Sequence, residues 1–170
     1  TPLTPDRLVC ALPYRTPVVS EMIISGKYYL IPEVFSILGI LCAQMLFSEL
    51  KNHSTFTICP IPLHNQRKKW RGFNQSEVAG KAMAQVLRIP LANLITRNKN
   101  TRTQKDLASE QRKLNIENAF VCAKEWEGNL PHSVLLIDDV CTTGQTLLEA
   151  TRVLKQSGVE IVWCISLAKD

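Results

Sequence analysis

The chain has 170 residues, 45% of them hydrophobic and 21% charged, which fits a single soluble globular domain spanning residues 1–170. Its formal net charge of +5 favours anionic partners, either phosphorylated metabolites or nucleic acid, but does not choose between them. The most apolar stretch, residues 35–47, is too short to span a bilayer, and the sequence begins without the pattern of a signal peptide. We therefore expect a cytoplasmic protein without a membrane partner.

Hydrophobic periodicity predicts alternating helices and strands along the chain. The expected helices are residues 32–50, a helix capped by Ser76 and ended by Pro90, and residues 146–156. The expected strands are residues 55–59, 94–96, 119–122, 134–137 and 161–167. This order predicts an α/β fold with an open, mainly parallel sheet, right-handed crossovers and flanking helices. The first thirty residues fit the alternation poorly, so we expect them to form a small flanking element.

Two connecting segments differ from the rest in composition. Residues 63–73 form a polar loop with the densest positive charge in the chain, and residues 98–112 are charged and poor in large apolar side chains. The second segment is therefore predicted to be mobile. A plain surface loop explains this composition almost as well as a lid that closes over a binding site.

The six cysteines form no C-x-x-C pair and lie near no histidine at zinc-finger spacing. We expect reduced thiols and no structural zinc in this chain. Cys141 differs from the others because it lies inside a Thr/Gly turn. There it supplies a small side chain and a backbone N–H, with a redox role as the alternative.

The most informative segment is residues 134–146, which read VLLIDDVCTTGQT. Four aliphatic residues predict a buried parallel strand, and Asp138 and Asp139 follow where such a strand emerges at the ligand-binding edge of an open sheet. Two carboxylates there can accept hydrogen bonds from vicinal hydroxyls or lie near a hydrated cation. The turn that follows offers hydroxyls, backbone N–H groups and the start of a helix to an anion. The segment suits ribose 5-phosphate.

Two other interpretations of this segment were weighed. The first is a buried strand that ends in a solvated acidic turn, although adjacent aspartates make poor core material. The second is the acidic strand of a nucleotide hydrolase, which would need a G-x-x-x-x-G-K-[ST] loop elsewhere in the chain. The Gly-Lys pairs Gly26-Lys27 and Gly80-Lys81 both lack the glycine five residues earlier and the Ser or Thr that should follow. The hydrolase interpretation fails.

The Asp-Asp, Thr-Thr-Gly-x-Thr pattern resembles the phosphoribosyl-pyrophosphate (PRPP) loop of type I phosphoribosyltransferases. The resemblance implies that Asp138 and Asp139 are catalytic residues that hold the ribose 2- and 3-hydroxyls and lie near Mg²⁺, in part through water. It also implies a loop after the first core strand that grips pyrophosphate. The residues implied for the 5-phosphate are Cys141, Thr142, Thr143, Gly144, Gln145 and Thr146, and those implied for pyrophosphate are Leu63, His64, Arg67 and Arg71.

The basic loop narrows the resemblance to the ComF family, which includes ComFC and GntX-like proteins. Pro-x-Pro-Leu followed by basic residues and by Arg71-Gly72-Phe73-Asn74-Gln75 resembles that family, and so does the order of weaker matches between residues 12 and 168. Those matches are Gly26-Lys27-Tyr28, Arg97-x-x-x-Thr101-x-x-Gln104, Arg112-x-x-Asn115 and Ala119-Phe120. Many members carry an N-terminal zinc module built from C-x-x-C pairs, whereas Cys10 alone precedes the core here, so either the module was lost or the chain was cut.

The resemblance implies a type I phosphoribosyltransferase fold with an N-terminal hood. It further implies a flexible loop that closes over PRPP, with Arg102, Gln104, Lys105 and Arg112 near the pyrophosphate. The leading hypothesis is a phosphoribosyltransferase domain that binds PRPP with magnesium and serves DNA uptake or nucleotide-related metabolism. Whether any pentosyl group is transferred, to which acceptor, and whether the protein is a homodimer stay open.

A competing hypothesis belongs to a different class of protein. Arg67, Lys68, Lys69 and Arg71 surround Trp70, and positive charge beside an aromatic ring is the usual chemistry of single-stranded DNA binding. The alternative is thus a non-catalytic competence protein that binds DNA and the competence machinery. A solvated basic turn is the plainest interpretation of the same residues.

Overall fold

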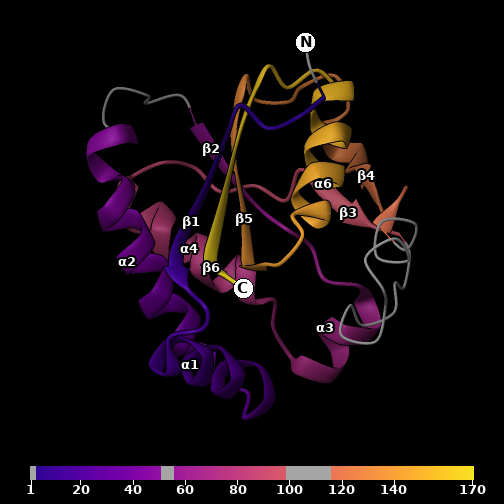
Figure 1. Ribbon diagram of the computed structural model, residues 1–170. Coiled ribbons are helices and arrows are strands. Elements are labelled where there is room, and N and C mark those ends of the chain that lie inside the picture. Colours follow the sequence, from indigo (N-terminus) through magenta and orange to yellow (C-terminus); the bar gives the residue numbers. More distant parts are fainter. Residues whose placement is uncertain (1–2, 51–55, 99–115) are drawn as a thin grey trace.

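A four-stranded parallel sheet with the order β1-β6-β5-β2 forms the centre of the molecule (Figure 1). The computed structural model describes residues 3–50, 56–98 and 116–170. The strands of this sheet are β1 (Arg7–Pro13), β2 (Phe56–Pro60), β5 (Ser133–Cys141) and β6 (Ile161–Lys169). A separate antiparallel pair consists of β3 (Ile95–Arg97) and β4 (Phe120–Cys122). The parallel sheet agrees with the prediction from the alternating elements.

The sheet separates two hydrophobic cores. Alternate side chains of β5 point to opposite faces, so Leu135 and Ile137 enter one core while Val134 and Leu136 enter the other. Helices α2 (Glu33–Leu50) and α4 (Gln75–Leu87) cover the first face. Helix α6 (Gln145–Gln156) and the β3-β4 pair cover the second, as Figure 1 shows. Burial on both faces explains why β5 begins as an unbroken aliphatic run.

The first thirty residues contribute more to the sheet than the sequence suggested. Strand β1 is the edge strand and pairs in parallel with β6, from Arg7 opposite Trp163 to Pro13 opposite Lys169. Helix α1 (Pro17–Tyr28) is the part that flanks the sheet, and it packs against α2. The prediction of a flanking element therefore holds for α1 and is wrong for β1. An edge strand half covered by neighbours has no strong apolar alternation to detect.

The basic segment contains a short helix where the sequence predicted a loop. Helix α3 (Asn65–Arg71) begins where the Gln66 N–H donates to Nδ1 of His64 at 3.3 Å. It ends at Gly72, which adopts the left-handed conformation with a φ of 79°. The helix is only seven residues long and has no buried side chain, so hydrophobic periodicity could not reveal it.

Two further boundaries differ from the predictions. Helix α4 is capped by Asn74, whose Oδ1 accepts the N–H of Ser76 at 3.2 Å, and not by Ser76 itself. Strand β5 does not stop at Ile137 but continues to Cys141, because β6 stays paired with it as far as Lys169. The two aspartates therefore lie within the strand, beyond the point where β2 ends opposite Ile137.

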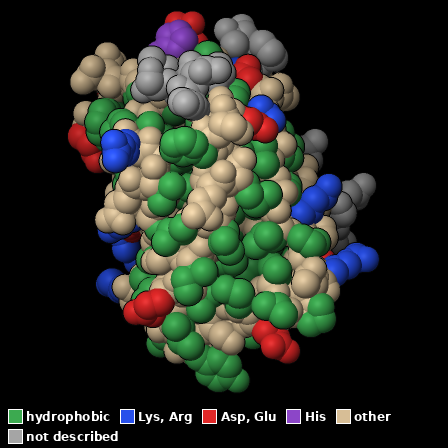
Figure 2. All heavy atoms as spheres, turned by 90° about the vertical axis from the view of Figure 1, so that its left-hand side faces the viewer, with side chains coloured by type: hydrophobic (Ala, Val, Ile, Leu, Met, Phe, Trp, Pro, Cys, Tyr) green, Lys and Arg blue, Asp and Glu red, His purple; other side chains and the backbone are tan. Residues whose placement is uncertain are grey.

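Helix α2 is apolar on all sides. Its inner face belongs to the core, but its outer face exposes large side chains: Ile37, Ile40, Leu41, Met45 and Phe47. Figure 2 shows this side of the molecule, over which hydrophobic side chains are widely spread. By length and hydropathy alone this 18-residue helix could also cross a membrane, a weak indication that core helices of soluble proteins give as well.

Candidate functional site

The elements that carry the predicted site residues meet at the carboxyl end of the parallel sheet. Figure 1 shows α1, α3 and the turn between β5 and α6 at this end. The loop after each parallel strand begins at the same edge of the sheet, and this edge is where open α/β sheets bind ligands. Beyond Ile137, β5 has β6 on one side and no β2 residue on the other. The acidic pair is therefore open to ligands on the β2 side.

Backbone and hydroxyl donors fix the orientation of both carboxylates. Asp138 Oδ1 accepts the N–H of Asp139 at 2.9 Å and the hydroxyl of Ser76 at 3.4 Å. Asp139 Oδ1 accepts the N–H of Val140 at 2.7 Å. Both side chains are partly exposed, so they remain within reach of a ligand. This is a preoriented pair of acceptors of the kind that two vicinal hydroxyls require.

The two carboxylates differ in their electrostatic surroundings. Burial, and after it the neighbouring Asp139 carboxylate, raise the pKa of Asp138 to about 7. The N–H of Asp139 and the charges of Lys27 and Arg97 oppose this rise. Ionising Asp138 is therefore costly, and such a perturbed carboxyl is typical of functional sites.

Three cations from separate elements surround the acidic pair. Lys27 of α1 forms an ion pair with Asp139, with 2.9 Å between Nζ and Oδ2. Burial lowers the pKa of Arg71, and the Asp139 carboxylate opposes that shift. Arg97 of β3 is more deeply buried, with its pKa likewise lowered by burial, and the Asp138 carboxylate opposes the shift. Such closely spaced positive charge at a sheet edge suits an anionic ligand.

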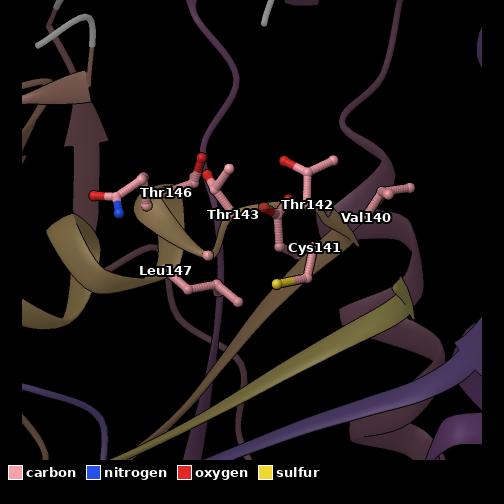
Figure 3. Close-up of a pocket in the computed structure, with 9 residues that line it drawn as sticks. Val140, Cys141, Thr142, Thr143, Thr146 and Leu147 are labelled. Atoms are coloured by element: carbon pink, nitrogen blue, oxygen red, sulfur yellow. The ribbon is translucent and has the colours of Figure 1, made fainter. Parts of the chain in front are cut away.

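The turn from β5 to α6 forms a small pocket (Figure 3). Thr142 and Thr143 are exposed and point to one side, while Cys141 and Leu147 point the other way and are buried. Gly144 takes a φ of 75° and caps α6 without a side-chain hydrogen bond. The first turn of α6 lines the pocket, so the positive end of the helix dipole and the first backbone N–H groups lie beside it. All six residues predicted for the 5-phosphate line this pocket, together with Asp138, Val140 and Leu147.

The Arg-Gly-Phe-Asn-Gln segment joins α3 to α4 and shapes the site. Gly72 ends α3, and the ring of Phe73 contacts that of Phe35 in α2, with 6.0 Å between centroids. Asn74 is buried, and its Nδ2 donates to the carbonyl of Ile61 at 2.9 Å. It therefore fixes the start of α4 to the segment that leaves β2. These residues are structural supports for the site.

Gln75 is the unusual residue of that segment. It is 1% exposed, and neither its amide oxygen nor its amide nitrogen has a hydrogen-bond partner among the described residues. Buried amides without partners are rare and costly. The Nε of Arg71 is likewise buried and without a partner in the described part of the chain. Unused donors and acceptors thus lie in the same segment as Ser76, the hydroxyl donor to Asp138.

The residues predicted for pyrophosphate lie along the exit from β2. Leu63 and His64 precede α3 and are partly exposed, and His64 uses its Nδ1 as the cap of that helix. Arg67 lies near Arg71 and Arg97, whose pKa values its charge lowers. The predicted flexible-loop residues Arg102, Gln104, Lys105 and Arg112 lie outside the described residues.

Sequence reasoning missed three residues at this site: Lys27, Ser76 and Arg97. Lys27 and Arg97 were noted as parts of weak family matches, and Ser76 was assigned as a helix cap. A local pattern could not have placed them, because each reaches the acidic pair from an element far from β5 in the sequence. Among the described residues, no group of three or more His, Cys, Asp or Glu side chains could hold a metal ion.

Comparison with known proteins adds an independent line of support. Residues 74–170 match the family model described as a phosphoribosyl transferase domain. The chain is 39% identical over 114 residues to Competence protein F of Haemophilus influenzae, covering 66% of this chain and 49% of that protein. It is 30% identical over 170 residues to DNA utilization protein YhgH of Escherichia coli, covering 94% and 71%. Competence protein ComFC of Bacillus subtilis is 31% identical over 114 residues, covering 66% and 43%. The chain thus spans between about two fifths and seven tenths of these relatives.

Solved structures agree at the level of fold. The allosteric regulatory enzyme of purine biosynthesis aligns with a TM-score of 0.54 at 17% identity, covering 85% of this chain and 30% of that one. The glutamine PRPP amidotransferase from B. subtilis, solved with ADP and GMP, aligns with a TM-score of 0.53 at 15% identity, covering 85% and 30%. The matched family model, the curated relatives and the parallel sheet together show that the chain belongs to the ComF family of type I phosphoribosyltransferase domains.

Proposed function

We propose that this domain binds PRPP, as its magnesium complex, at the carboxyl end of β5. The observation that carries the proposal is the juxtaposition of a preoriented acidic pair with a pocket lined by the first turn of α6. The carboxylates would accept hydrogen bonds from the ribose 2- and 3-hydroxyls. The Thr142–Thr146 turn would hold the 5-phosphate through hydroxyls, backbone N–H groups and the helix dipole.

The pyrophosphate group would lie on the side of α3 and β3. Arg71 lies close to the acidic pair, and Arg67 and Arg97 lie close to one another. Partly buried guanidinium groups pair strongly with phosphate oxygens because each presents several donors in a fixed plane. We assign pyrophosphate to this arginine cluster, with Leu63 and His64 lining its approach from β2.

Magnesium enters this proposal as part of the substrate. The described residues offer two carboxylates and no third ligand, which fits a hydrated cation held mainly by phosphate oxygens. In a transfer reaction the bond from C1 of ribose to pyrophosphate oxygen breaks, its electron pair leaves with pyrophosphate, and C1 forms a bond to the acceptor. The arginines would offset the leaving charge while Asp138 and Asp139 hold the diol.

The curated relatives point to a cellular role in DNA uptake or DNA utilisation. Their names describe competence and DNA utilization, and the E. coli relative aligns along 94% of this chain. We infer that this domain serves such a process in the cytoplasm, where PRPP binding would either regulate it or supply a reaction related to nucleotide metabolism. Free thiols fit that compartment, since all six cysteines are unpaired.

Calorimetry tests the proposed ligand part by part. Wild-type protein should bind PRPP with Mg²⁺, and also ribose 5-phosphate and pyrophosphate separately. The double variant Asp138→Ala/Asp139→Ala should no longer bind ribose 5-phosphate. Arg67→Ala/Arg71→Ala should bind pyrophosphate at least about tenfold more weakly than the wild type. Glu77→Ala is the matched acidic control, because Glu77 of α4 pairs with Lys68 of α3 and Lys81 of α4 and not with the acidic pair. No binding of PRPP to the wild type at millimolar concentration would contradict the proposal.

Helix α3 favours single-stranded DNA as a second ligand. Trp70 is 62% exposed, Lys68 and Lys69 beside it are exposed, and the Arg71 guanidinium lies 5.8 Å from the Trp70 ring centroid. An exposed ring among cations can stack on a base while the cations contact phosphates.

A fluorescent oligonucleotide separates this second ligand from PRPP. Trp70→Ala and Arg67→Ala/Lys69→Ala should each weaken binding, and the affinity of the wild type should fall as salt rises. Lys124→Ala, in a different part of the molecule, should bind like the wild type. Affinity that does not change with salt would exclude a DNA-binding role for α3.

A further inference from the structure

The ion pair between Lys27 and Asp139 gives the acidic pair a cation of its own. Nζ lies 2.9 Å from Oδ2, and the two side chains are only 21% and 16% exposed. Lysine side chains usually extend into water, so a lysine held this closely against a carboxylate is a specific arrangement. The ion pair also joins two distant elements, the last turn of α1 and the part of β5 beyond Ile137.

The packing of α1 leaves Lys27 little freedom to move away. Ile23 is fully buried in the core, and Gly26 lies against Phe35 of α2. A Cβ added at Gly26 would lie 2.6 Å from the Phe35 ring, so this ring packs directly against the backbone of α1. The residue next to Gly26 is therefore positioned by the backbone of α1. This contact explains how one lysine reaches β5 from outside the sheet.

The ammonium group occupies the side of Asp139 that a metal ion would need. Oδ1 of Asp139 is used by the Val140 N–H, and Oδ2 is used by Lys27. A free divalent cation would have to replace Lys27 or bind beside a positive charge that repels it. An uncharged diol meets no such penalty, because a carboxylate oxygen can accept a hydroxyl and the ammonium at once.

We propose that Lys27 is a positioning residue that orients Asp139 for the ribose hydroxyls and keeps free divalent cations off the acidic pair, so that magnesium arrives only on pyrophosphate. The orientation of the sugar rests on the proposed PRPP function, whereas the exclusion of cations does not. Of the three donors of the ammonium group, two remain for the oxygens of the ligand.

Binding of Mn²⁺ to the ligand-free protein, followed by electron paramagnetic resonance, tests the exclusion of cations. Lys27→Gln should bind Mn²⁺ at least about tenfold more tightly than the wild type, because it removes a positive charge within a few ångströms. Lys27→Arg keeps the charge and should stay within about threefold of the wild type. Lys81→Gln is the matched control, since Lys81 forms its ion pair with Glu77 and not with the acidic pair. Equal Mn²⁺ affinity in Lys27→Gln and the wild type would overturn the proposal.

Titration with ribose 5-phosphate in EDTA tests the orientation of Asp139. Without any metal, Lys27→Gln should weaken binding by about tenfold, and Lys27→Arg should restore most of it. Thermal unfolding of each variant shows whether the fold is kept, and a folded Lys27→Gln with wild-type sugar affinity would contradict the positioning role. If the wild type itself binds no sugar phosphate, the proposed PRPP function fails, while the Mn²⁺ comparison still decides whether Lys27 excludes cations.

Discussion

At the scale of single residues, the two adjacent carboxylates of the acidic pair lower the stability of the fold. Asp138 lies beside Asp139 in a partly buried strand, and burial together with that neighbour raises its pKa to about 7. The unfolded chain ionises this carboxyl near its ordinary pKa of 3.8, so between these two values the unfolded state loses its proton first. The free energy of unfolding therefore falls as the pH rises from about 4 to about 7 and then levels off.

Asp138→Asn should consequently stabilise the fold at pH 8 while it weakens ligand binding. The amide cannot ionise, so the gain should be on the order of 1–4 kcal/mol at pH 8 and should vanish near pH 4. Urea unfolding at the two pH values measures it. Glu125→Gln, at an exposed position, is the control and should change little at either pH. A stability difference that is the same at both pH values would show that the ionisation of Asp138 is not its cause.

At the scale of elements, close packing of helices sets the frame on which the site is built. Helices α2 and α4 cross at Gly39, where an added Cβ would lie 2.5 Å from the carbonyl oxygen of Ala79. Ser76, which donates to Asp138, lies in the first turn of α4, one turn before Ala79. A displacement of α4 would therefore move the Ser76 hydroxyl relative to the Asp138 carboxylate.

Gly39→Ala should destabilise the protein although alanine is the better helix former. Alanine gains up to about 1 kcal/mol in helix propensity, but a backbone clash of this size costs about 1–3 kcal/mol and moves α4. Ser48→Ala, on the exposed face of the same helix, should be neutral or slightly stabilising. Urea unfolding compares the two variants. An unchanged or higher midpoint for Gly39→Ala would mean that α2 and α4 can separate without cost.

How far the sequence could predict the structure depends on whether a feature has a local pattern or arises from the packing of elements. The aliphatic run of β5, the apolar faces of α2 and α6 and the turn at Gly144 are local patterns, so these elements and the pocket that we propose for the 5-phosphate could be expected. Helix α3 escaped prediction because its seven residues bury nothing. Lys27 and Arg97 could not be placed because their contacts with the acidic pair depend on how α1 and β3 pack, which periodicity does not contain.

At the scale of the whole molecule, an ion pair connects the edge strand of the sheet to a helix far along the sequence. Lys155 of α6 is buried, with a side chain 1% exposed, and its Nζ lies 2.8 Å from Oδ2 of Asp6 just before β1. Asp6 Oδ2 also accepts the N–H of Val162 at 2.8 Å. Lys155 donates as well to the carbonyl of Glu160 at 3.2 Å. One carboxylate thus connects β1, α6 and β6.

Asp6→Asn should cost on the order of 2–3 kcal/mol at neutral pH, because it leaves the buried Lys155 ammonium without its counter-charge. The value is below that of a fully buried pair, since Asp6 is itself 36% exposed. Burial acts to raise the pKa of Asp6, but Lys155 and the Val162 N–H outweigh it and lower the pKa below 3.8. The contribution of Asp6 is therefore complete above about pH 5 and is lost as the pH falls through this lowered pKa.

Wild type and Asp6→Asn should accordingly converge in stability under acid and differ most above pH 5, as urea unfolding across this range would measure. Asp6→Asn/Lys155→Met should recover much of the loss, since it removes the stranded charge together with its partner. Asp170→Asn is the control, because Asp170 pairs with Arg15 at the exposed end of the same sheet, 3.7 Å apart, and should cost at most about 1 kcal/mol. A double variant no more stable than Asp6→Asn would place the contribution of Asp6 in its bond to Val162, and β1 would then be held by backbone pairing rather than by charge.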